Sequence, residues 1–235
     1  MCCETASLIV FSASAVFGLT KTVKALELDT SFSPIILEGL MHNKISEESA
    51  MSDWNTKRRT MRRYDLTAHI YDMRYAEEQA AKIEAALKSV SIGKKCFILD
   101  VGCGTGLLFN FVANKAEIVI GLDISRKTLL QAKKRSRKFV NAHLIWADAD
   151  NLPFRNSVFS HIFAVTLIQN MPNPVKTLDE VKRVAKENAV IVVTGLKRKF
   201  SLEAFEDLLR IFGLNIIEIK SENLKCHVAI CLKLH

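Results

Sequence analysis

The sequence predicts a doubly wound α/β domain built on a seven-stranded, mostly parallel sheet. Short apolar runs, typical of strands covered on both faces, alternate with helical patterns over five strand–helix units. A glycine-rich loop at 102–106 follows the first of these strands. The last two strand-like runs leave no room for a helix between them, so we expect them to pair as an antiparallel hairpin.

The predicted elements follow one another from residue 72 onward. Ala, Glu and Lys dominate residues 72–90, whose apolar positions recur at spacings of three and four, as in an amphipathic helix. We expect strands at 96–101, 118–122, 142–146, 159–167, 189–194, 216–220 and 226–233. We expect helices at 107–115, 125–138, 174–186 and 201–212, with Ser125 as an N-cap, Pro174 in a first turn and Gly213 as a C-terminal stop.

Charge divides the chain into two unequal parts. Residues 1–50 carry a net charge of −3 and the remainder +11. This difference in sign indicates that residues 1–50 are a leader, and we expect the working protein to begin near Met51. The predicted organisation is therefore a leader at 1–50, a basic lid segment with a helix at 51–92, and the α/β domain at 93–235.

The leader predicts neither a membrane anchor nor a secretion signal. Its apolar run, residues 8–19, is shorter than the roughly 20 residues that span a bilayer. Glu4 is the only charged side chain before the run, whereas signal peptides begin with positive charge. The six cysteines form no CxxC pair, which predicts buried free thiols and no metal site. Together these features predict a cytoplasmic protein.

The loop at 99–106, LDVGCGTG, is the first candidate binding element. Gly102, Gly104 and Gly106, with Cys103 between them, permit a sharp turn and close approach of the backbone to a ligand. The next helix presents its N-terminus there. A tight turn without a ligand is the alternative interpretation.

Asp100 distinguishes this loop from a dinucleotide-binding loop. Dinucleotide-binding loops read G-x-G-x-x-G, whereas here Leu107 follows the third alternate glycine. A carboxylate beside the loop would repel a pyrophosphate. It suits a ligand with a cationic end, such as an amino-acid moiety.

Acidic residues also end the second and third strands. Asp123 offers two oxygens to the hydroxyls of a ribose, or it caps the following helix. Asp148 is placed to accept a hydrogen bond from an adenine amino group, a role for which Asp150 competes. Leu122, Ile124 and Leu167 are candidates to sandwich a flat base, although each also suits the core.

These motifs, with ADADNLPF and FSHIFAVTLIQNMPNP, resemble class I S-adenosylmethionine-dependent methyltransferases, particularly the small single-domain group called type 11, over roughly residues 64–235. The resemblance implies S-adenosylmethionine as cofactor and the strand order 3-2-1-4-5-7-6 with the seventh strand antiparallel. It implies that Asp100 and the glycines surround the methionine part, that Asp123 holds the ribose, and that Asp148 with Ala149 lies at the adenine.

The substrate side departs from the family pattern. Ser160 replaces a frequent Asp, and Gln169 and Asn170 replace two frequent histidines. The segment at 170–173 matches the N-P-P-Y box of amino-group methyltransferases only in part. No general base is evident, and a catalytically silent cofactor-binding subunit is the alternative function.

The segment YDLTAHIYDMRY at 64–75 is similar to family segments that cover the cofactor pocket. Tyr71, Arg74 and Tyr75 are expected to supply a wall and a partner for the cofactor carboxylate; the alternative is that the aromatic residues only pack the helix onto the domain. Thr166 and Leu167, near the end of the fourth strand, complete the predicted cofactor site. Tyr64, His69, Gln169 and Asn170 are the substrate-side candidates.

Two basic segments, 57–63 and 126–138, suggest an RNA or another polyanion as partner. No aromatic residues interleave with them in the sequence, so a solvated basic face is the competing interpretation. A small acceptor of the quinone type is the second substrate hypothesis and a protein the third. A dehydrogenase is a weaker competitor.

Overall fold

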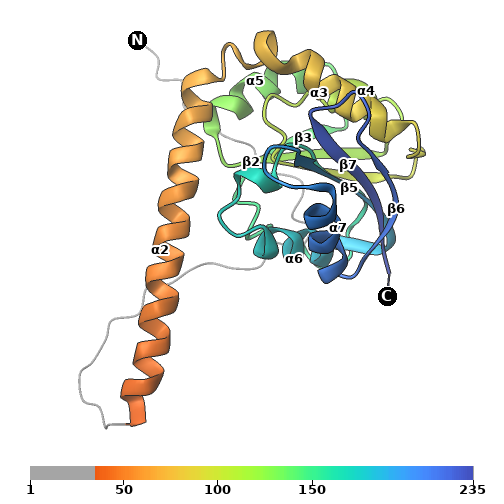
Figure 1. Cartoon of the computed structure of the whole chain (residues 1–235). Helices are drawn as coiled ribbons and strands as arrows, with labels where there is room; N and C mark the ends of the chain where they lie inside the picture. Colours follow the sequence, from red (N-terminus) through yellow and green to blue (C-terminus); the bar gives the residue numbers. More distant parts are fainter. Residues whose placement is uncertain (1–34, 235) are drawn as a thin grey trace, which may run out of the picture.

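The computed structural model describes residues 35–234, with side chains from residue 51 onward. The apolar run at 8–19 and most of the predicted leader lie outside the described residues. Helix α2 (Ile35–Thr67) continues through position 50, the predicted boundary between leader and lid segment. Figure 1 shows α2 standing beside the α/β domain. None of the described helices combines the length and hydropathy needed to cross a bilayer.

The sheet has seven strands in the order β3-β2-β1-β4-β5-β7-β6. β7 is antiparallel to β5 and β6, and the other pairs are parallel. This confirms the predicted order and the C-terminal hairpin. The strands are β1 (Phe97–Val101), β2 (Ile118–Asp123), β3 (Ala142–Trp146), β4 (Phe159–Ala164), β5 (Ala185–Leu196), β6 (Leu214–Lys220) and β7 (Cys226–Lys233).

The helices cover both faces of the sheet (Figure 1). They are α3 (Tyr71–Leu87), α4 (Phe109–Val112), α5 (Arg126–Ser136), the 3-10 helix η1 (Ile168–Asn170), α6 (Pro174–Val184) and α7 (Leu202–Ile211). The predicted helix caps are present: Ser125 Oγ accepts from Thr128 N at 3.2 Å, and Gly213 follows α7 with φ +64°. Pro174 occupies the first turn of α6.

The helix expected at 107–115 is wrong in extent, because only Phe109–Val112 is α-helical. The backbone N–H groups of Phe109, Asn110 and Phe111 each bond to the carbonyl three residues earlier, which is the tighter 3-10 pattern. The chain leaves the glycine loop through this tight turn before one α-helical turn forms.

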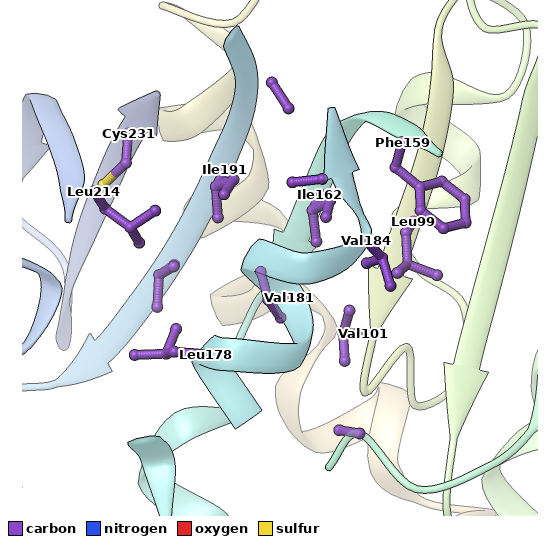
Figure 2. Packing of buried hydrophobic residues seen from close by; sticks show 14 of the residues in the cluster. Leu99, Val101, Phe159, Ile162, Leu178, Val181, Val184, Ile191, Leu214 and Cys231 are labelled. Atoms are coloured by element: carbon purple, nitrogen blue, oxygen red, sulfur yellow. The ribbon is translucent and has the colours of Figure 1, made fainter. Parts of the chain in front are cut away.

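Alternate side chains of the central strands enter two cores on opposite faces of the sheet. Leu99 and Val101 of β1 pack with Ile162 of β4 and with the buried face of α6 (Figure 2). Ile98, which directly precedes Leu99 and therefore faces the opposite way, packs with α3 and α4 on the other face. The cysteines at 96, 103, 226 and 231 are free, and all but Cys96 are buried. Among the described residues no cluster of His, Cys, Asp and Glu forms a candidate metal site.

Candidate cofactor site

Two adjoining cavities lie where the carboxyl ends of β1, β2 and β4 meet α2 and α3. The larger is lined by Lys57, Thr60, Tyr64, Tyr71, Gly102, Gly104, Leu122, Asp123, Ile124, Thr128, Ala147, Asp148, Ala149, Val165, Thr166, Leu167, Asn170 and Met171. The smaller shares four of these residues and adds Asp72, Ala76, Gln79, Ile83, Asp100, Cys103, Thr105, Leu107 and Leu108. Such a position at the carboxyl ends of parallel strands is where open α/β sheets bind ligands.

The glycine loop forms the floor between the cavities. Gly102 N and Cys103 N donate to Leu122 O at 2.7 and 2.9 Å, which ties the loop to β2. Gly104 has φ +53°, and a Cβ built there meets no atom within 4 Å. The backbone at 104 therefore borders open cavity space that a side chain would enter, and its conformation favours glycine.

Asp100 is a buried carboxylate without a hydrogen-bonding partner among the described residues. It is 4% exposed and faces the smaller cavity. Burial, together with the smaller effect of the nearby Asp123 carboxylate, raises the pKa of Asp100 to about 8. Burying a carboxyl group without a hydrogen-bonding partner costs free energy, and a cationic group of a ligand would offset that cost.

Asp123 both supports the glycine loop and lines the larger cavity. Its two carboxylate oxygens accept from Gly104 N at 2.8 Å and Ser125 N at 2.7 Å. Burial raises the pKa of Asp123, and these backbone donors oppose that rise. Each carboxylate oxygen has a second lone pair, so Asp123 retains acceptor capacity toward the larger cavity that it lines.

Lys57 is a site residue that sequence reasoning assigned to a basic surface. It is only 7% exposed, and its Nζ donates to both Asp148 oxygens at 2.7 and 2.8 Å. It also pairs with Asp150, whose other oxygen accepts from Thr177 Oγ1 at 2.5 Å. A single ammonium is thus shared by both candidate adenine-site acids. The sequence signal that could have placed Lys57 at the site is its helical spacing with Thr60 and Tyr64, because all three lie on one face of α2.

An apolar slot lies beside this ion pair. The three predicted base-sandwiching residues, Leu122, Ile124 and Leu167, all line the larger cavity, as does Ala149. Thr166 lines it too, with the unusual φ of +61° at the end of β4. Thr166 Oγ1 accepts from the buried Lys82 Nζ at 3.1 Å and donates to Gln79 at 2.8 Å, so α3 holds this wall.

The lid segment places only some of its candidates at the site. Tyr64 and Tyr71 line the cavity, and burial raises the pKa of each phenol, so both remain protonated donors. Arg74 and His69 are exposed and line neither cavity. Tyr75 packs on Tyr71, with ring centroids 5.0 Å apart.

On the substrate side, Asn170 lines the cavity and Gln169 does not. Asn170 Nδ2 donates to Tyr64 Oη at 3.1 Å and to Thr166 O at 2.8 Å, while Arg63 donates to its oxygen. The Oε1 atom of Gln169 is buried with no hydrogen-bonding partner in the described structure.

Further contacts lock α2 and α3 over the loop. Asp72 at the start of α3 accepts from Thr105 Oγ1 at 2.5 Å and pairs with Arg135 at 2.8 Å. Asp65 of α2 accepts from Ser125 Oγ at 2.6 Å. One of the basic residues in the segment at 126–138 is thereby committed to an internal contact.

Comparison with known proteins gives the fold and site a family context. Residues 99–193 match the family model described as "Methyltransferase domain". The chain is 28% identical over 144 residues to a malonyl-[acyl-carrier protein] O-methyltransferase of Marinomonas sp., covering 60% of this chain and 53% of that protein. It is 33% identical over 110 residues to a demethylmenaquinone methyltransferase of Staphylococcus saprophyticus, covering 45% and 47%. The chain thus spans about half the length of these curated relatives.

Solved structures show the same fold at low identity. A SAM-dependent methyltransferase from Aquifex aeolicus superposes with a TM-score of 0.59 at 19% identity, over 65% of this chain and 89% of that one. The putative methyltransferase in a complex with the Trm112 activator of Haloferax volcanii gives 0.62 at 15% identity, over 73% and 98%.

Proposed function

We propose, from the premise that this chain contains a class I S-adenosylmethionine-dependent methyltransferase domain, that it transfers the methyl group of that cofactor to an acceptor entering the cavity beside α2. The family uses S-adenosylmethionine. The observation that carries the proposal for this chain is Asp100, a buried carboxylate without a partner in the described structure, facing a cavity floored by glycine backbone.

The donor set suits the parts of this cofactor. Asp100 fits a cationic group, and the adjacent loop backbone leaves space for the methionine part. Asp123 retains acceptor capacity for ribose hydroxyls. The apolar slot beside Ala149 suits a flat base, with the Asp148 carboxylate at its edge. The site therefore fits S-adenosylmethionine, and it does not fit a pyrophosphate.

The residues of this chain contribute positioning and exclusion of water. When bound, the cofactor supplies a methyl group already activated on a sulfonium. Tyr64 and Tyr71 wall the cavity as neutral phenols, and Lys57, Thr60 and Tyr64 of α2 line one side of it. Holding two reactants in line can lower a barrier by roughly 7–11 kcal/mol, so transfer needs no strong base when the acceptor is already nucleophilic.

Two measurements in sequence test the proposal. Calorimetry on the folded chain should show binding of S-adenosylmethionine and S-adenosylhomocysteine; absence of both contradicts the proposal. Incubation with radiolabelled cofactor and fractionated native extract should then show label in RNA, protein, lipid or a small metabolite. Binding without transfer to any fraction would instead assign the chain to a cofactor-binding subunit.

A further inference from the structure

We propose that the mouth of the larger cavity binds single-stranded nucleic acid and that the methyl acceptor is a nucleotide turned from that strand into the cavity. This inference rests on the proposed function and adds the class of acceptor. The surface concerned, called here the basic rim, consists of Trp54, Arg58 and Arg62 of α2, Arg126 and Lys127 of α5, and Trp146 of β3.

Both tryptophans of the chain lie at the surface. Trp54 is 44% exposed and Trp146 is 55% exposed, although tryptophan is highly buried on average. Exposed aromatic faces beside positive charge are the usual platform for stacking unpaired bases. The sequence did not predict this pair of exposed tryptophans beside positive charge, because position 146 lies far along the chain from the basic segment at 57–63.

Trp146 is held at the edge of the cavity. It pairs in register with Asp123 at the carboxyl end of β2, and its Nε1 donates to Ile124 O at 2.8 Å. Both Asp123 and Ile124 line the cavity. The Nε1 edge of the indole is thus anchored at the mouth, while more than half of the side chain remains exposed.

Helix geometry places Trp54 on the flank of α2 that faces the same mouth. At about 100° per residue, Trp54 lies roughly 60° around the helix from Lys57 and roughly 20° from Asp65. Lys57 contacts Asp148 just beyond β3, and Asp65 accepts from Ser125 Oγ and Lys127 N at the start of α5. Trp54 therefore points toward the region that holds β3 and α5.

Uncompensated positive charge surrounds these two rings. Arg58 follows Trp54 by about 40° around α2, and Arg126 and Lys127 begin α5. All are exposed, and none forms an ion pair with another described residue. Of the nearby acids, Asp148 and Asp150 pair with Lys57 and Asp65 caps α5, while Asp53 beside Trp54 forms no ion pair with another described residue. The four cations of the rim still outnumber this one acid.

Only an unpaired nucleotide can enter the larger cavity behind the basic rim. The cavity lies beneath α2, where the aromatic walls Tyr64 and Tyr71 stand, so a base inside a duplex does not reach it. A nucleophilic nitrogen or oxygen of the inserted nucleotide attacks the methyl carbon. The new bond to carbon forms as the S–CH3 bond breaks, its electron pair stays on sulfur, and any proton on the nucleophile passes to water.

Fluorescence anisotropy tests the rim. The probes are fluorescein-labelled eight-nucleotide single strands of one mixed sequence, as RNA and as DNA, titrated with the full chain saturated with S-adenosylhomocysteine. Trp146→Ala should weaken binding at least about fivefold, the lower end of a stacking contribution. Trp146→Phe keeps an aromatic face but loses the hydrogen bond to Ile124, so its retained affinity identifies stacking as the cause.

A charge-matched pair tests the phosphate contacts. Arg58→Gln with Lys127→Gln should reduce the slope of log affinity against log salt by about 1.4, for two contacts on a single strand. The control, Lys95→Gln with Lys115→Gln, removes the same charge at the amino ends of β1 and β2, the opposite edge of the sheet. This control should leave the slope unchanged.

The outcomes separate this inference from the proposed function. No anisotropy change at low salt in a chain that binds S-adenosylhomocysteine normally overturns the inference alone. Equal losses of salt slope in the two charge-pair variants also overturn it. If polyglutamate binds through the basic rim and the oligonucleotides do not, the inference is likewise overturned, because the partner is then an acidic protein. Equal affinity for RNA and DNA supports stacking and phosphate contacts, and stronger RNA binding supports them with an added 2′-hydroxyl contact.

Discussion

At the scale of single residues, two carboxylates close to each other set the electrostatics of the site. Asp100 has no partner in the described structure, whereas Asp123 accepts two backbone hydrogen bonds. Their environments push them toward different roles. Asp100 is the candidate partner for a cationic group of a ligand, and Asp123 supports the loop and retains acceptor capacity.

Cofactor affinity should therefore depend on pH through Asp100. Its pKa of about 8 means that the carboxyl is mostly protonated at pH 6, and a cationic ligand favours the ionised form. Affinity for S-adenosylmethionine should rise by up to about tenfold per pH unit from pH 6 and level off near pH 8. Calorimetry at pH 6, 7, 8 and 8.5 measures this, and Asp100→Asn should abolish the trend.

The Asp100 carboxyl should also make the stability of the cofactor-free chain depend on pH, but here stability should fall as pH rises. Its folded pKa lies above the ordinary value of 3.8, so its contribution to folding is complete below about pH 4 and is lost as pH rises through about 8. Melting temperature should fall between pH 6 and 8.5, and less so in Asp100→Asn. A pH-independent affinity in the parent would contradict the first expectation, and a pH-independent melting temperature would contradict the second.

Asp123→Ala should weaken the cofactor more than Asp148→Ala. The first change removes predicted hydrogen bonds to the ribose, each typically about 1.5–3 kcal/mol, and releases Gly104 N and Ser125 N. The second leaves Lys57 paired with Asp150. Calorimetry with circular dichroism checks this, and parental affinity in Asp123→Ala would make the ribose assignment wrong.

At the scale of elements, Lys57 forms a buried ion pair that helps to secure α2 to the domain. Lys57→Met would leave Asp148 and Asp150 without their shared cation, and such a loss in a buried pair costs about 3–5 kcal/mol. Urea denaturation should show a drop on the order of 3 kcal/mol in the free energy of unfolding. The double variant Lys57→Met with Asp150→Asn should recover part of it; a loss below 1 kcal/mol, on the order of an exposed pair, would contradict the buried role.

The glycine loop gives a second prediction at this scale. Gly104→Val should abolish cofactor binding while the domain stays folded, because the side chain enters cavity space and no protein atom lies within 4 Å of its Cβ. The positive φ adds strain of about 1–2 kcal/mol. Gly93→Ala is the matched control, since a Cβ there also meets nothing within 4 Å and its φ is not positive. Near-parental affinity in Gly104→Val would identify the loop as a turn only.

At the scale of the whole molecule, a ligand in the two cavities would contact α2, α3 and the sheet together, because all of them supply lining residues. Ligand at 100 times its dissociation constant stabilises a folded protein by about 2.7 kcal/mol. S-adenosylhomocysteine should therefore raise the melting temperature by roughly 5–10 °C, and NAD should not. A shift with NAD alone would favour the dehydrogenase alternative.

The sequence alone determined the architecture and the place of the glycine loop. Strand and helix periodicity, the caps at Ser125 and Pro174, and the loop LDVGCGTG are local signals, since each depends on neighbours within a few residues. The resemblance carried by the motifs around Asp100 and Asp123 added the strand order, which the structure confirms. The extent of α4 was missed because the loop geometry, which no propensity encodes, imposes a tight first turn.

Only the tertiary structure decided which charged and aromatic residues belong to the site. Lys57 and Arg58 are neighbours in one basic run, yet one is buried in an ion pair and the other exposed, because α2 presents its faces to different surroundings. On α3, likewise, Tyr71 lines the cavity whereas Arg74 is exposed and does not line it. Trp146 reaches the mouth of the cavity only because parallel strands bring their carboxyl ends to one edge. Such contacts join residues about 90 positions apart, and a pattern that repeats every two to four residues contains no information about them.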